Sequence, residues 1–175
     1  MTISGLEEAR AHWLLGAFFL AIILEQYLPL LGRDGRPLRE RTLLTPVVLL
    51  LTGVSVWGTT VFAGDVHDTL VHSVWGDILF AAGALELARR RRVYERPWLD
   101  YVIPLTIVSC GVLFVLHTVG ETSGTEARWH LALGLLLTLA GLIDTIRVKR
   151  RSTAPVPFTL VPLTAFALVL MAYPG

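Results

Sequence analysis

Six long apolar runs, separated by short polar connections, set the pattern of this 175-residue chain. The runs cover roughly residues 12–31, 42–63, 70–88, 99–118, 128–146 and 155–174. A helix needs about 20 mostly apolar residues to cross the hydrocarbon core of a bilayer, and each run is close to that length. The pattern therefore predicts an all-α integral membrane protein, with six transmembrane helices in one membrane domain over 1–175.

Two residue types recur along these runs at nearly the same interval. A histidine opens each odd-numbered run, at His12, His72 and His130. A proline lies in each even-numbered run, at Pro46, Pro104 and Pro162. Both series advance by almost the same number of positions at each step. Because two independent markers share this interval, we expect three helical-hairpin repeats, at about 1–63, 64–121 and 122–175.

The composition agrees with lipid as the main solvent. Charged residues are 17% of the chain and hydrophobic residues 54%, whereas soluble domains are about a quarter charged. Of the 15 basic residues, 13 fall in the connections after the first, third and fifth runs. Short loops rich in Lys and Arg favour the cytoplasm. We therefore expect a multi-pass cell-membrane protein with both termini extracytoplasmic, and we expect no nucleic-acid partner at a net charge of +1.

All histidines fall toward the predicted extracytoplasmic side. They are His12, His67, His72, His117 and His130. Imidazoles bind transition metals and haem iron and also carry protons, so this shared position predicts a site near the outer surface. The structural alternative is that each histidine is an amphipathic residue at the headgroup level.

Haem b is the first cofactor that we expect there, because two neutral imidazoles from different helices can hold its iron. His72 and His130 are the preferred axial pair, and His12 and His117 are the substitutes. A haem would make the protein a b-type membrane electron carrier. Its expected partners are the lipid bilayer and either a redox partner or further copies of the same chain.

Two kinds of neighbouring residue suit such a haem. Gly76 and Gly134 lie one turn beyond His72 and His130, where a missing side chain would let a flat macrocycle approach the backbone. Arg128 could neutralise a propionate. The alternative for the glycines is close helix packing, for which small residues are common in membranes.

A metal ion is the second expectation. If the odd-numbered helices surround a pseudo-threefold axis, His12, His72 and His130 converge on one Zn, Cu or Fe ion. His67 and His117 are further candidate ligands. Such a site suits a metal-ion transporter or a membrane metalloenzyme, for which the sequence assigns no catalytic residue.

Four carboxylates within the runs are candidates for a proton relay: Glu25, Asp77, Glu86 and Asp144. Ionisable residues inside a membrane are costly and are commonly functional, so these residues keep a proton-coupled transporter open as an alternative function. Glu86 and Asp144 lie about four helical turns beyond His72 and His130, on the same side of their helices.

These carboxylates also have structural alternatives. Glu86 could pair with Arg89 or Arg90, and Asp144 could pair with Arg147, since residues three or four apart are neighbours on a helix. A hydrogen bond to Thr59 or Thr60 is the corresponding alternative for Asp77.

Overall fold

The computed structural model describes residues 3–31, 43–60, 66–118, 124–150 and 157–172; of these, the side chains of 3–9, 11, 26–31, 68, 157 and 158 lie outside the description. All regular structure in these ranges is helical, as predicted. The helices are α1 (Ile3–Leu31), α2 (Leu44–Thr59), α3 (Val66–Arg90), α4 (Val102–His117), α5 (Gly124–Lys149) and α6 (Pro157–Met171), with a 3-10 turn η3 (Pro97–Tyr101) before α4. The expected repeat junctions fall outside the described ranges.

Three of the helical segments are long and apolar enough to cross a membrane. They are Thr69–Arg90, Pro97–His117 and Gly124–Lys149. Where side chains are described, the other three predicted runs contain shorter apolar helical stretches, at His12–Glu25, Leu44–Thr59 and Thr159–Met171. The first of these stretches lies within the 29-residue helix α1. A helix of 16 residues such as α2 is about 24 Å long at 1.5 Å per residue, which is less than the roughly 30 Å hydrocarbon thickness. The structure thus supports a membrane protein by helix length and composition.

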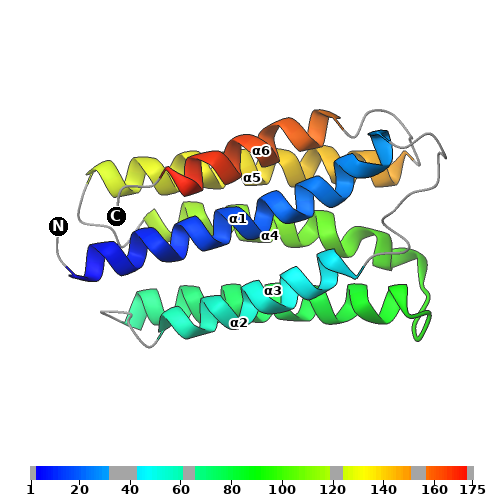
Figure 1. The fold of residues 1–175 in the computed structure, drawn as a ribbon, viewed down its shortest axis with the longest axis horizontal. Coiled ribbons are helices and arrows are strands. Elements are labelled where there is room, and N and C mark those ends of the chain that lie inside the picture. The colour runs from blue at the N-terminus through cyan, green and yellow to red at the C-terminus, as the bar shows by residue number, and fades with distance from the viewer. Residues whose placement is uncertain (1–2, 32–42, 61–65, 119–123, 151–156, 173–175) are drawn as a thin grey trace.

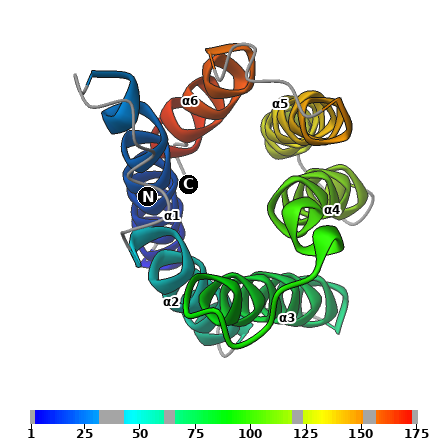
Figure 2. The same cartoon turned by 90° about the vertical axis from the view of Figure 1, so that its right-hand side faces the viewer.

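The six helices form a ring in chain order. Figure 1 shows them side by side along the long axis of the molecule, and the end-on view of Figure 2 shows α1 to α6 in succession around it, with α6 returning to α1. The closest packing joins α2 to α3, α4 to α5 and α1 to α6. Because neighbours in the ring run in opposite directions, α1, α3 and α5 begin at one end and α2, α4 and α6 begin at the other.

Large apolar side chains lie on both the inner and the outer faces of the helices. Leu133, Leu137 and Phe166 are fully buried among the helices. Leu135 and Leu168 are 58% and 56% exposed. Soluble monomers rarely expose large contiguous apolar patches, so an apolar exterior over the whole bundle fits a lipid environment.

Glycines let two of the helix pairs approach closely. A Cβ built on Gly53 of α2 would lie 2.9 Å from the carbonyl oxygen of Gly76 on α3. A Cβ built on Gly111 of α4 would lie 2.8 Å from the carbonyl oxygen of Gly134 on α5. Real Cβ atoms are not found that close to backbone, so only glycine permits these contacts, as small residues do at helix interfaces in membranes.

Candidate functional site

All five histidines meet at one end of the bundle. They come from four helices: His12 from α1, His67 and His72 from α3, His117 from the end of α4 and His130 from α5. We call these five residues the histidine cluster. The alternating direction of the helices explains the meeting, because the beginnings of α1, α3 and α5 lie beside the end of α4.

His117 and His130 are the central members of the histidine cluster. The ring centre of His117 is 5.0 Å from that of His130, 5.5 Å from that of His72 and 5.9 Å from that of His67. The ring of His12 is 6.0 Å from that of His130. His117 is 8% exposed and His130 is 5% exposed, whereas the other three are partly buried. The five rings therefore form one connected group around a buried centre.

Aromatic side chains close the inner side of the cluster. Phe114 lies 5.8 Å from His130, and Trp75 meets the edge of Phe114 at 4.1 Å. His72 stacks on Trp75 at 6.3 Å. The imidazoles consequently rest on an apolar floor that separates them from the middle of the bundle.

Two of the ring separations match those of two imidazoles on opposite sides of one metal. Two imidazoles that bind one metal from opposite sides have ring centres about 6 Å apart, since each metal–nitrogen bond is about 2 Å. The pairs His12 with His130, at 6.0 Å, and His67 with His117, at 5.9 Å, have this separation. Within the part of the chain that the structure describes, no three His, Cys, Asp or Glu side chains are grouped so as to hold an ion.

This geometry changes the ligand sets expected from the sequence. His72 and His130 were the preferred axial pair, but His117 neighbours both of their rings. The three-histidine set of His12, His72 and His130 is not assembled around one point among the described residues. The repeat interval identified these three but gave no weight to His117, which reaches the same end from an even-numbered helix.

The structure also describes the surroundings of the two glycines and the arginine expected beside a haem. Gly76 is packed against the indole ring of Trp57, and a Cβ on Gly134 would lie 2.7 Å from Val115. Both glycines therefore serve helix packing, which was the structural alternative. Arg128 is exposed on α5, away from the buried centre of the cluster.

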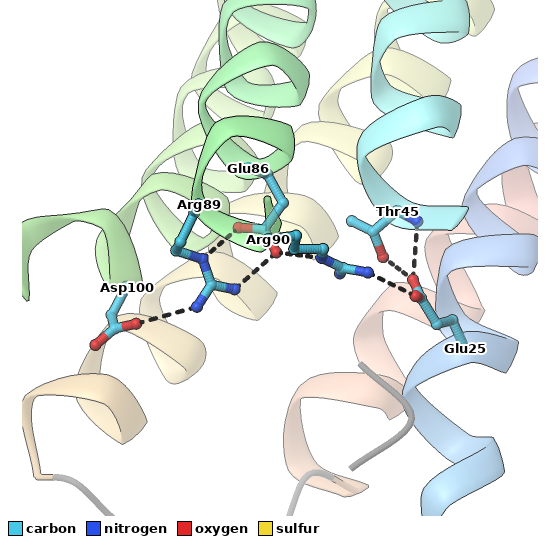
Figure 3. Close-up of polar contacts among 6 residues, drawn as sticks. All are labelled: Glu25, Thr45, Glu86, Arg89, Arg90 and Asp100. Atoms are coloured by element: carbon cyan, nitrogen blue, oxygen red, sulfur yellow. Dashed lines mark hydrogen bonds and ion pairs between the residues drawn. The ribbon is translucent and has the colours of Figure 1, made fainter. Parts of the chain in front are cut away.

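The opposite end of the bundle holds a network of ion pairs. We call it the arginine network, and it comprises Glu25, Thr45, Glu86, Arg89, Arg90 and Asp100. Figure 3 shows Arg90 between two carboxylates, with Nη1 2.9 Å from Glu25 Oε1 and Nε 2.8 Å from Glu86 Oε1. The side chains of Glu25 and Glu86 are 1% exposed and that of Arg90 is 3% exposed. The network therefore ties α1 to α3 through a buried arginine.

Further donors complete the coordination of both carboxylates. The backbone N–H of Thr45 donates to Glu25 Oε2 at 2.9 Å, and the Thr45 hydroxyl donates to the same oxygen. Arg89 donates to both oxygens of Glu86, at 2.8 and 2.7 Å. Each buried carboxylate thus accepts from two residues, as buried charges require.

Three of the four proposed relay carboxylates are therefore in ion pairs. Asp144 pairs with Arg147 at 2.6 Å, so the structural alternative holds for both Glu86 and Asp144. The partner of Glu25 is Arg90, 65 residues away, for which the sequence carries no local signal. Asp77 is exposed on the outer surface of α3, away from the histidine cluster. The side chain of Gln26, beside Glu25, lies outside the described residues.

Comparison of the chain with protein-family models, with curated proteins and with solved structures gave no match.

Proposed function

We propose that the protein is a six-span membrane protein that binds a redox cofactor, haem b, at the histidine cluster and carries electrons at the extracytoplasmic side of the membrane. One observation carries the proposal: five imidazoles from four helices gather around a buried centre. Helix packing alone does not require a group of imidazoles at one end of the bundle, whereas a haem or a metal ion is held by imidazoles from different helices.

The ring arrangement supports six spans. The shorter helices α2 and α6 take their places in the ring beside longer helices. Exposed residues on them, such as Leu51 of α2 and Leu168 of α6, are apolar. The arginine network and Arg147 lie at the opposite end from the histidine cluster. Under the positive-inside rule, this opposition supports a cytoplasmic arginine end and an extracytoplasmic histidine end, with both termini extracytoplasmic.

Helix contacts that recur at the interval of the three prolines support the hairpin repeats. The contact of Gly53 with Gly76, between the first and second hairpins, recurs as that of Gly111 with Gly134, between the second and third. The Gly83 position lies against the carbonyl oxygen of Pro46 as Gly141 lies against that of Pro104. The Glu86 to Arg89 ion pair likewise has its counterpart in Asp144 and Arg147.

His117 and His130 are the residues on which cofactor binding depends most, because they are the buried members and each neighbours at least two other rings. A bound haem would supply a one-electron couple. His130 with His12, or His117 with His67, would hold its iron. The aromatic floor would exclude water from the inner side of the group.

Absorption spectra of the detergent-purified protein, oxidised and then reduced with dithionite, test the proposal. We expect a Soret band that shifts on reduction and that is lost in His130→Ala if His12 and His130 hold the iron, or in His117→Ala if His67 and His117 hold it. Thr118→Ala is the matched control, since its hydroxyl donates within its own helix to the carbonyl of Val115. A Soret band that survives in both histidine variants would contradict the assignment of the site.

A transition-metal ion is the second candidate, favoured by the 6.0 and 5.9 Å spacing of two histidine pairs. A protein without a Soret band that contains Zn, Cu or Fe, lost in both histidine variants but kept in Thr118→Ala, would support this site and reject haem. If the purified protein contains neither group and binds neither on addition, both proposals are wrong.

A further inference from the structure

One ionisable side chain stands apart on the exterior of the bundle. Among the described residues of the three candidate spans, the exposed ionisable groups other than Asp77 lie close to the end of a span: Asp100, Arg128 and Lys149. Asp77 lies well inside the span Thr69–Arg90. At 1.5 Å per residue it is about 12 Å from the beginning of that span, which places it at the depth of lipid chains.

A carboxyl group at that depth needs a partner. Ionisable residues within a bilayer pair with one another or face a polar interior, but Asp77 faces outward. Among the residues that the structure describes, no hydrogen bond or ion pair to Asp77 is formed within the chain. The predicted hydrogen bonds from Thr59 and Thr60 are absent there, because both hydroxyls donate to carbonyls of their own helix, those of Val56 and Trp57.

The surface around Asp77 has the form of a helix-packing seam. Leu70, Val74, Asp77, Ala81 and Ala84 are all exposed, and they follow one another at alternating steps of four and three along the helix. This is the repeat by which two helices pack lengthwise. The two alanines would let a second backbone approach closely.

We propose that this face of α3 binds the same face of a second copy of the chain, with the two Asp77 carboxyl groups hydrogen-bonded to each other. Copies inserted with the same orientation are related by an axis along the membrane normal, so equivalent residues lie at equal depth. A protonated carboxyl donates to the other carboxyl, which accepts. The Asp77 carboxyl group of one copy can therefore bind the Asp77 carboxyl group of the other.

Among the exposed residues of the other described helices, none at this depth is polar. On the other helices, the exposed residues there include Val54, Val112 and Leu135, which are 51%, 44% and 58% exposed. A contact between α3 and one of those faces would leave the carboxyl in apolar surroundings. The inference requires that α3 spans the membrane, but it is independent of the cofactor.

Disulfide cross-linking in native membranes tests this interface. Single cysteines replace Val74 or Ala81 in a Cys110→Ala background, and a copper–phenanthroline oxidant is added. We expect covalent dimers from both positions. Leu135→Cys is the control, because Leu135 follows Gly134 as Asp77 follows Gly76, at the equivalent depth of α5, and it should give no dimer. Dimers from Leu135→Cys alone, or from none of the three, would overturn the proposal.

Substitution of Asp77 itself tests the carboxyl pair. Asp77→Leu should raise the dimer dissociation constant about tenfold, as expected for loss of one interhelical hydrogen bond. Asp77→Asn, which can still donate and accept, should keep the dimer. Energy transfer between labelled copies in vesicles measures both constants. Equal dissociation constants for Asp77→Leu and the unsubstituted protein would show that the carboxyl group does not hold copies together.

Discussion

The two ends of the bundle are built from different chemistry. At the arginine network, opposite charges are buried in contact: Glu25 and Glu86 are 1% exposed and Arg90 lies between them. At the histidine cluster, groups of one kind face one another, with ring centres 5.0 to 6.0 Å apart. In the arginine network, the buried charges are paired with one another. In the histidine cluster, several imidazoles that can bind a metal lie together without an opposite charge among them. This contrast supports a structural role for the arginine end and leaves the histidine end as the place of the cofactor binding that we propose.

Replacement of Arg90 by Met gives the largest expected loss of stability. It leaves Glu25 and Glu86 buried without the guanidinium between them, and the loss of one partner from a buried ion pair costs about 3–5 kcal/mol. Equilibrium unfolding in detergent measures the change, and cofactor content per folded molecule should stay constant. This outcome would show that the arginine end holds α1 to α3 without serving the histidine end.

Arg92→Met is the matched control for Arg90→Met. The side chain of Arg92 is 85% exposed, so its loss should change the free energy of unfolding by less than about 0.5 kcal/mol. The triple variant Arg90→Met, Glu25→Gln, Glu86→Gln should recover part of the stability, because it removes the uncompensated charges. Equal destabilisation by Arg90→Met and Arg92→Met would contradict the structural role of the network.

At the histidine cluster, His117→Phe should have a small effect on stability and a large effect on cofactor content. The phenyl ring keeps most of the ring contacts to His72 and His130, so the free energy of unfolding of the cofactor-free protein should change by less than about 1.5 kcal/mol. Cofactor content should fall to the background level, as measured by absorption or metal analysis. A variant that unfolds much more easily and keeps its cofactor would reverse the assignment of the two ends.

Short-range patterns in the sequence predicted much of this structure. The six apolar runs predicted six helices, and spacings of three and four residues predicted the pairs of Glu86 with Arg89 and Arg90 and of Asp144 with Arg147. Each of these signals arises within one helix. The periodicity of a helix places residues three or four apart on the same face, so these pairs do not depend on how the helices pack.

What the sequence left open depends on how the helices are placed around the ring. The pair of Glu25 with Arg90 joins residues 65 apart. The central position of His117 depends on the end of α4 lying between α3 and α5. The outward direction of Asp77 depends on which face of α3 meets α2. The positions of the helices relative to one another follow from glycine contacts and side-chain packing. The sequence of one apolar run does not contain this information.

Among the buried carboxylates, the smallest effect is expected at Asp144, and substitution of its counterpart Glu86 provides the comparison. The Asp144 and Arg147 side chains are 11% and 24% exposed and form one ion pair within a helix, so Asp144→Asn should cost about 0.5 kcal/mol. Glu86 holds the corresponding position in α3 but binds both Arg89 and the buried Arg90. Glu86→Gln should therefore cost about 2 kcal/mol or more, since hydrogen bonds to buried charges are worth about 1.5–3 kcal/mol.

Detergent unfolding of these two variants side by side separates the effect of position in the repeat from that of burial. A larger loss for Glu86→Gln would place the stabilising charge where Arg90 links α1 to α3, with the α5 pair as a weaker contact at the corresponding position. Equal losses would mean that the local pair of three-residue spacing carries the energy in both helices. The additional bond from Arg90 to Glu86 would then add nothing measurable, and the structural distinction of the arginine end would rest on the bond from Arg90 to Glu25.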